Sequence, residues 1–151
     1  MKSMLCVALG VVAMMTAGCG ASPTAPSAQP TSLLEGTWRG TITVTPTGQA
    51  LVAGPTTWTF RSVSGSAGST YTATIESLNP WLPVSASAQT ALVPPGLSPS
   101  DVSTLGDYAS PRGCRGSFSS YGTTSATRFT ATFHGVDCNT QRFDGSVELS
   151  R

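Results

Sequence analysis

The sequence predicts an all-β domain, built as a single antiparallel up-and-down β-barrel or barrel-like meander of about seven or eight strands. The first indication is an alternation of apolar and polar residues with a period of two. In TWRGTITVT, residues 37–45, Trp38, Gly40, Ile42 and Val44 share one face, and threonines and an arginine share the other. The second indication is an enrichment in Thr, Val, Phe, Tyr and Trp, which favour strands. Together they predict strands that bury one face.

The same alternation continues along the chain. It recurs in TTWTFRSV (56–63), STYTATIESL (69–78), GCRGSFSSY (113–121), SATRFTATFHG (125–135) and RFDGSVEL (142–149). The stretches SGSAGS and YGTTS lie between such segments and are typical of hairpin turns. The segment SASAQTAL, residues 85–92, is expected to add one or two further strands.

One long segment, residues 79–112, interrupts the pattern, because it holds six prolines and most of the apolar residues that lie outside the predicted strands. It is longer than an ordinary connection between strands, so we expect a proline-rich insertion. Within it, Ser98 resembles a helix N-cap, Pro99 suits the first helical position, and Asp101 would lie near the helix dipole. These signals predict a short helix that ends at Gly106.

The chain begins with a segment that is typical of export. Lys2 is followed by sixteen uncharged, mostly apolar residues, which is fewer than the roughly 20 that a membrane-spanning helix needs. One positive charge, an apolar stretch and small residues before a cleavage point are the layout of a signal peptide. We therefore expect residues 1–18 to be a signal peptide that is cleaved after Gly18.

The residues around the expected cleavage point resemble the lipobox of bacterial lipoproteins. Thr16, Ala17 and Gly18 precede Cys19, and the resemblance implies that Cys19 is acylated and becomes the first residue of the mature chain. The alternative is a plain signal peptide with an incidental cysteine, because Thr16 stands where the lipobox usually has leucine. The uncharged, proline-containing residues that follow favour the anchor, since they would make residues 19–32 a tether.

The anchor predicts both a location and a partner. Acyl chains on Cys19 would hold the protein in a membrane of the bacterial cell envelope. Gly20 rather than aspartate follows the cysteine, which favours the outer membrane in an enterobacterial type of sorting. Residues 33–151 then form one all-β domain of a size that supports a modest core.

Composition excludes one large class of partner. Without residues 1–18 the chain has no lysine and no methionine, and its seven arginines balance seven acidic residues. Binding to a nucleic-acid backbone needs a basic surface. We therefore expect no nucleic-acid partner.

Two cysteines remain beside Cys19, and they predict a disulfide. An even pair of cysteines in an exported chain, here Cys114 and Cys138, is typical of a structural disulfide. A thiol or metal site is the competing interpretation, but the chain has no CxxC spacing and one histidine. We expect no metal and no cofactor.

The start of the first predicted strand resembles the GxW signature of lipocalin-type barrels. Gly36, Thr37 and Trp38 supply that signature. The resemblance implies that Trp38 closes the base of an eight-stranded cup and that an arginine near the end of the last strand, here Arg151, lies across it. Small bacterial lipoproteins, including barrel-shaped protease inhibitors with one disulfide, show a similar plan.

Catalytic and calcium-binding interpretations both lack essential residues. His134 is the single imidazole and Asp137 follows three positions later, but no GxSxG nucleophile motif is present. His134 also falls on the polar face of its predicted strand, so we expect a solvated residue at the strand end. Residues 137–148 match part of a calcium loop, but Arg142 occupies the position that needs glycine.

These observations predict a non-catalytic binding module for an apolar small molecule or a protein partner. The insertion would form a lid or ligand contact at one barrel end, through Trp81, Leu82, Leu92 and Val93. The competing expectation is that these residues pack down and leave no cavity, because small barrels fill their interiors with side chains. A hydrolase that uses His134 and a protease-inhibitor-like barrel remain as alternatives.

Overall fold

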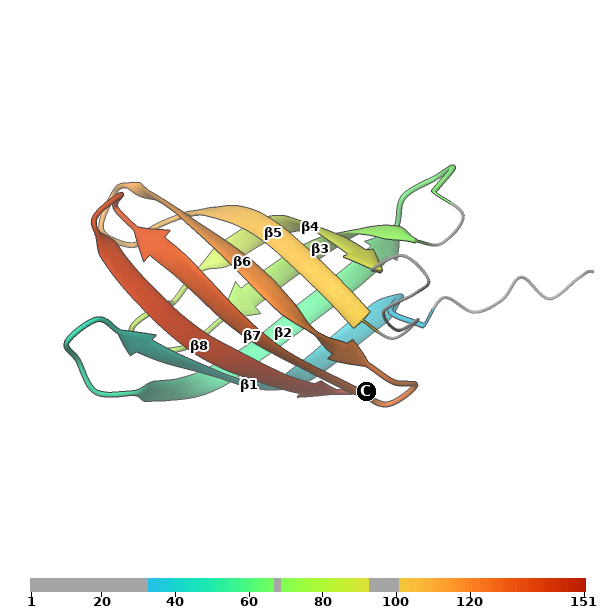
Figure 1. Ribbon diagram of the computed structural model, residues 1–151, viewed down its shortest axis with the longest axis horizontal. Helices are drawn as coiled ribbons and strands as arrows, with labels where there is room; N and C mark the ends of the chain where they lie inside the picture. The colour runs from blue at the N-terminus through green and yellow to red at the C-terminus, as the bar shows by residue number, and fades with distance from the viewer. Residues whose placement is uncertain (1–32, 67–68, 93–100) are drawn as a thin grey trace, which may run out of the picture.

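The computed structural model describes residues 33–66, 69–92 and 101–151. These residues form a closed barrel in which each strand is antiparallel to both neighbours and the last strand pairs with the first (Figure 1). Its eight strands are β1 (Gly36–Pro46), β2 (Val52–Ser62), β3 (Thr70–Ser77), β4 (Ser85–Leu92), β5 (Asp101–Ala109), β6 (Arg115–Thr124), β7 (Arg128–Asp137) and β8 (Gln141–Ser150). The predicted all-β, up-and-down barrel is confirmed. In this described part of the chain no helix is long and apolar enough to cross a membrane.

The predicted proline-rich insertion with a short helix is wrong over the described residues. The expected strand at residues 85–92 is confirmed as β4, whereas Asp101 to Gly106 lie in β5 rather than in a helix. Val102 and Tyr108 alternate inward along β5, at 1% and 4% exposure. Pairing with β4 and β6 satisfies the β5 backbone on both sides, and this outweighs the local helix-start signals. Ser98 and Pro99 lie outside the described residues.

The predicted alternation is clearest in β1. Trp38, Ile42 and Val44 are buried, at 0%, 4% and 0% exposure, whereas Arg39 and Thr41 face outward. The antiparallel register of β1 and β8 pairs Arg39 with Ser150. Barrel closure therefore brings the C-terminus beside the start of the first strand.

Aromatic rings fill the interior beside glycines of neighbouring strands. The cross-strand pairs are Phe118 with Gly106, Tyr108 with Gly116, Phe143 with Gly135, and Phe133 with Gly145. A Cβ atom at any of these glycines would overlap the paired ring. Because a small barrel has little interior space, large rings fit where the opposite residue has no side chain.

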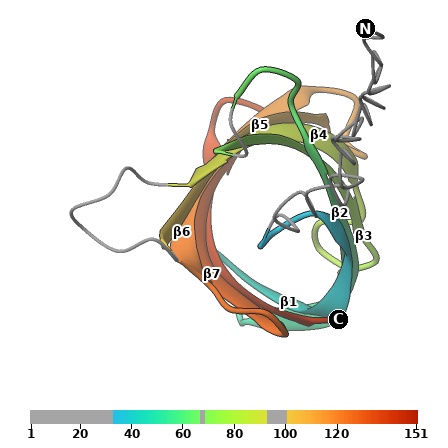
Figure 2. The ribbon, with the colours of Figure 1, turned by 90° about the vertical axis from the view of Figure 1, so that its right-hand side faces the viewer.

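The barrel has two ends that are closed differently. The Trp38 end is the one at which β1 begins and β8 ends, and the Trp81 end is the one at which β3 ends and β4 begins. Figure 2 looks onto the Trp38 end, where the start of the described chain, in blue, turns into the ring of strands. That turn brings the buried side chain of Leu34 to the end of the core.

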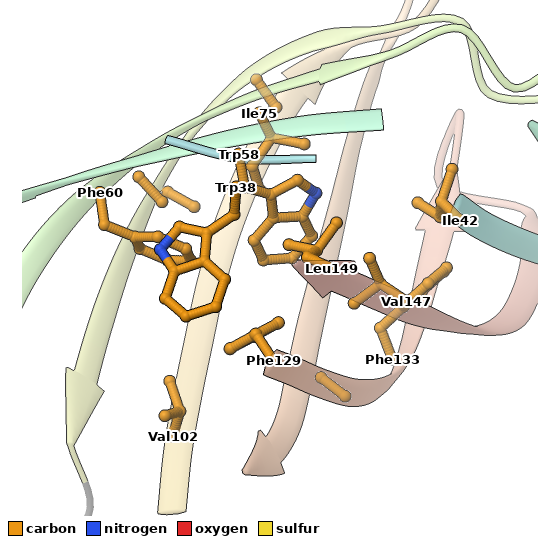
Figure 3. Close-up of a cluster of buried hydrophobic side chains, with 14 of the residues drawn as sticks. Trp38, Ile42, Trp58, Phe60, Ile75, Val102, Phe129, Phe133, Val147 and Leu149 are labelled. Atoms are coloured by element: carbon orange, nitrogen blue, oxygen red, sulfur yellow. The ribbon is translucent and has the colours of Figure 1, made fainter. Parts of the chain in front are cut away.

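An aromatic cluster packs at each end of the interior. At the Trp38 end, Trp38, Trp58, Phe60 and Phe129 pack with ring centroids between 5.6 and 6.5 Å apart (Figure 3). At the Trp81 end, Phe143 is central, because it contacts the rings of Trp81, Tyr108 and Phe133 at 5.3, 6.4 and 6.1 Å. The two clusters explain why the interior is largely filled.

Candidate functional site

At the Trp38 end, the indole N–H of Trp38 and the guanidinium of Arg151 both have hydrogen-bond partners. The indole Nε1 of Trp38 donates a hydrogen bond of 2.8 Å to the Leu34 carbonyl oxygen, and Trp38 is fully buried. The Arg151 guanidinium lies 4.3 Å from the centroid of the same ring and donates to the Leu33 carbonyl oxygen at 2.7 Å. Gly36, with a φ of 120°, permits the turn that brings Leu34 over the ring.

The loop between β3 and β4 presents Trp81 at the opposite end. Its anchor is Asn79, which is 0% exposed and whose side-chain amide donates to the carbonyl oxygens of Ile42 and Val52 at 3.2 and 2.8 Å. The side-chain Oδ1 atom of Asn79 accepts hydrogen bonds from the backbone N–H groups of Trp81 and Leu82. Prolines at both ends of this short segment restrict φ further. The backbone that carries Trp81 is therefore held in place.

The Trp81 side chain packs between the Phe143 ring and the Arg112 guanidinium, but its indole N–H lacks a hydrogen bond. Its ring packs on Phe143, and the Arg112 guanidinium lies 4.7 Å above its centroid. Trp81 is only partly buried as a residue, yet its Nε1 atom is buried and has no hydrogen-bond partner. Such an unsatisfied buried donor costs free energy. Trp38 carries no such penalty.

A buried carboxylate holds Arg112 over the ring. Asp137 is 0% exposed, pairs with the Arg112 guanidinium, and accepts hydrogen bonds from the hydroxyls of Tyr108 and Ser110 at 3.1 and 3.2 Å. Burial, followed by the nearby Asp137 carboxylate, raises the pKa of Tyr108 above its ordinary value. Asp137 therefore belongs to the barrel end and is not a partner of His134.

The predicted disulfide between Cys114 and Cys138 is present and lies beside the hydrogen-bond network of Asp137. Cys114 immediately precedes β6 and Cys138 immediately follows β7, with their Cα atoms 5.2 Å apart. The bond lies next to Asp137 and fixes the turn that carries Arg112. Because both sulfurs are bonded to each other, the group of Cys114, Asp137 and Cys138 is not a set of thiolate ligands for a metal.

A small cavity lies in the core next to the Trp81 end. Its volume is about 20 Å³, and Ile42, Leu82, Tyr108, Phe118 and Phe143 are among its lining residues. Leu82 follows Trp81 in the loop, and Phe143 supports the Trp81 ring. The cavity is too small for an organic ligand while its lining side chains keep this arrangement.

The predicted single lid is wrong, because the structure separates its residues. Trp81 and Leu82 lie at the Trp81 end, and Leu82 is buried at 5% exposure. Leu92 ends β4 and packs against the core at the Trp38 end. Val93 lies outside the described residues. Because β4 runs along the barrel wall between Leu82 and Leu92, residues that are close in the sequence lie at opposite ends of the barrel.

The outer surface of β4 to β8 carries a second concave region, which we call the outer groove. It has a volume of about 1030 Å³, and its lining includes Leu105, Asp107, Arg115, Ser119, His134, Arg142 and Asp144. Among the described residues, its two arginines and two aspartates form no ion pair. The groove is open and is lined by both polar and apolar residues, and the charges of its two arginines and two aspartates balance.

His134 is exposed, as predicted, but it lies within β7 rather than at a strand end. Its Nε2 atom hydrogen-bonds to the Ser119 hydroxyl at 2.8 Å, because Ser119 is its cross-strand partner in β6. Asp144 is its partner in β8, yet among the described residues no carboxylate is bonded to the imidazole. Sequence reasoning missed Ser119, although the register of the β6–β7 hairpin pairs the two residues.

Comparisons with known proteins identify the fold and no family. No protein family and no curated protein matches the sequence. The structure is similar to EF1p2_mFAP2b bound to DFHBI, with a TM-score of 0.58 and 18% identity over 79% of this chain and 94% of that one. It is also similar to a redesigned β-barrel, b11L5F_LGL, with a TM-score of 0.51 and 21% identity over 80% of this chain and 92% of that one. At these identities the likeness concerns the small eight-stranded barrel alone.

Proposed function

We propose that the protein is a non-catalytic binding module, tethered to the outer membrane of a bacterial cell envelope, whose barrel binds an apolar small molecule. The observation that carries this proposal is the apolar cavity next to the Trp81 end, where Phe143 both lines the cavity and packs against the partly buried Trp81 ring. Apolar cavities at barrel mouths are frequent ligand sites. EF1p2_mFAP2b, a barrel of similar fold, was solved bound to DFHBI, so this architecture is compatible with a small-molecule ligand.

Analysis of the natively expressed protein tests the binding role. The full chain is purified from its own envelope, extracted with organic solvent, and the extract is analysed by mass spectrometry. We expect one apolar compound in an amount comparable to the protein, absent from an outer-membrane protein purified in parallel. If the two extracts contain the same compounds, the proposed small-molecule function is wrong.

Labelling with radioactive palmitate tests the tether separately. The wild-type chain is expected to incorporate label and Cys19→Ala to incorporate none, because Cys19 is the proposed acylation site. Equal labelling of the two proteins, or no label in either, contradicts the lipid anchor. Fractionation of the labelled wild type then tests the outer-membrane location.

A protein partner at the outer groove is a second candidate function. Leu105 is 62% exposed at this groove, and an exposed apolar residue in a concave polar surface suits an interface. The disulfide-bonded barrel also fits the protease-inhibitor-like plan. Inhibition of a panel of secreted proteases by wild type and by Leu105→Glu tests this candidate, which requires inhibition that the substitution weakens.

A hydrolase is the remaining alternative, and the Ser119–His134 hydrogen bond is the observation in its favour. A serine nucleophile needs an imidazole base, and the base is normally oriented by a carboxylate. The proposal of a non-catalytic protein predicts no reaction with a fluorophosphonate probe. Labelling of wild type that is lost in both Ser119→Ala and His134→Ala would contradict it.

A further inference from the structure

We infer that Trp81 is a displaceable plug, and that an aromatic molecule of one or two fused rings binds at the Trp81 end in the space that the indole leaves. This inference rests on the proposed small-molecule function and assigns its entrance and its ligand class. It is carried by the unsatisfied Nε1 of Trp81, by the apolar cavity lined by Phe143, on which the Trp81 ring packs, and by the fixed backbone of the loop.

The hydrogen bonding of the two end tryptophans makes one of them easier to move. Nε1 of Trp38 is bonded to the Leu34 carbonyl oxygen, and that bond would be broken if the ring left its place. Nε1 of Trp81 is buried without a partner. Rotation of the Trp81 ring into solvent therefore gives this N–H a water partner, which partly offsets the loss of packing against Phe143.

The backbone around Trp81 restricts the movement to its side chain. Asn79 is fully buried and binds backbone groups of β1, of β2 and of the loop itself. A tryptophan side chain moves between discrete rotamers. Opening therefore needs no rearrangement of the loop, and the wall of the site stays in place.

The space behind the plug defines the class of ligand. Trp81 does not itself line the cavity of about 20 Å³, but two of its neighbours do: Phe143, on which its ring packs, and Leu82, the next residue in the loop. The surrounding side chains are mostly apolar, so a flat aromatic ligand would replace the indole on the face of Phe143.

Charge at the mouth favours a neutral ligand. Arg112 is held over the ring by the buried Asp137 carboxylate. Its guanidinium would stack on the ligand as it stacks on Trp81. Because Asp137 already balances its charge, an anionic group on the ligand would gain little there.

Fluorine NMR with 2-naphthol as the probe tests the inference on the intact protein. The full chain is labelled with 5-fluorotryptophan and placed in nanodiscs, with empty nanodiscs as the blank for probe partitioning. The chain has three tryptophans, so Trp38 and Trp58 are internal controls, and Trp→Phe variants assign the signals. We expect saturable binding that moves the Trp81 signal to a solvent-exposed position while the other two signals change little.

Two variants test the plug and the cavity separately. Trp81→Ala removes the plug, so the affinity for 2-naphthol should rise about tenfold if the open state is populated about one-tenth of the time. Ala86→Val narrows the cavity that Ala86 lines and should weaken binding, because the ligand would extend from the place of the indole into that cavity. Leu78→Ala, an exposed position of the same loop, is the matched control and should bind like the wild type.

The outcomes separate this inference from the proposed function. Binding that leaves the Trp81 signal unchanged, or that Trp81→Ala does not strengthen, overturns the plug while a ligand site elsewhere stands. No binding of 2-naphthol to either protein overturns the plug and the aromatic ligand class. If the native protein nevertheless carries a bound apolar compound, the proposed function survives that result.

Discussion

The two ends of the barrel use the same pair of residue types in different ways. At each end an arginine guanidinium covers a tryptophan ring, Arg151 over Trp38 at 4.3 Å and Arg112 over Trp81 at 4.7 Å. The Trp38 end is closed by backbone carbonyl groups of Leu33 and Leu34. The Trp81 end relies on a buried carboxylate and a disulfide, and leaves the indole N–H unsatisfied. At the Trp38 end the indole N–H is therefore hydrogen-bonded. At the Trp81 end the buried indole N–H has no partner, and this reduces the stability of that end.

The largest expected difference between the ends concerns the two tryptophans. Trp38→Ala should reduce the free energy of unfolding by about 3 to 5 kcal/mol, because it removes a fully buried indole. Trp81→Ala should cost less than half as much, since Trp81 is partly exposed and its N–H has no partner. Thermal melting of the two variants and the wild type measures both effects. Equal losses would mean that the ends are energetically equivalent.

Loss of the disulfide is expected to have the second-largest effect on stability, and the effect should be local to the Trp81 end. The bond joins residues 24 positions apart, and the chain-entropy relation gives a stabilisation of about 3.5 kcal/mol for a loop of that length. The double variant Cys114→Ala, Cys138→Ala should lower the melting temperature accordingly. The disulfide lies at the Trp81 end, so hydrogen exchange should increase first at the backbone amides of residues 110, 112–114 and 138. A uniform increase would contradict a local role.

The ion pair of Arg112 is expected to contribute more than an exposed pair of the same kind. Arg112→Ala leaves the Asp137 carboxylate, 1% exposed, with only hydroxyl partners, and should cost about 2 kcal/mol. Arg128→Ala breaks a pair with Glu148 whose side chains are 65% and 67% exposed, and should cost less than about 1 kcal/mol. Chemical denaturation of both variants measures the two losses. A similar small loss in each would show that Asp137 is not stabilised by Arg112.

The smallest effect is a dependence of stability on alkaline pH. The pKa of Tyr108 is raised in the folded barrel, while an unfolded tyrosine titrates near about 10. Below that value Tyr108 is protonated in both states, and its contribution is fully present. Above about pH 10 the unfolded state loses the proton first, so stability falls as pH rises. The melting temperature of wild type should therefore decline more steeply than that of Tyr108→Phe above this pH, and parallel curves would exclude Tyr108 as the cause.

The resemblance to lipocalin-type barrels correctly predicts a feature of the Trp38 end and none of the Trp81 end. It rests on Gly36 and Trp38, and the structure places Arg151 over the Trp38 ring. Its implied role for Trp38 as a plug of the base stays a prediction until the melting experiment is done. The resemblance implies no role for Arg112 or Asp137 beside Trp81, because no motif in the sequence connects these three residues.

One wrong prediction and one pairing that was already rejected have a common physical cause. Ser98 and Pro99 are strong local signals for a helix, but Asp101 to Ala109 pair with strands on both sides. Asp137 is near His134 in the sequence, but consecutive positions along a strand point to opposite faces, and Asp137 faces the interior. In both cases the partner that decided the outcome lies on another strand.

Residue alternation and the count of cysteines are visible without coordinates. They are sufficient to establish that the chain is built of antiparallel strands with one buried face and that Cys114 and Cys138 can pair. The three-dimensional arrangement was needed to show that residues 101–109 contribute β5 to the barrel wall, that Ser119 meets His134 and that Asp137 holds Arg112 over Trp81. The reason is that side-chain alternation is a local property of a strand. Strand register and burial, in contrast, depend on how all eight strands close on one another.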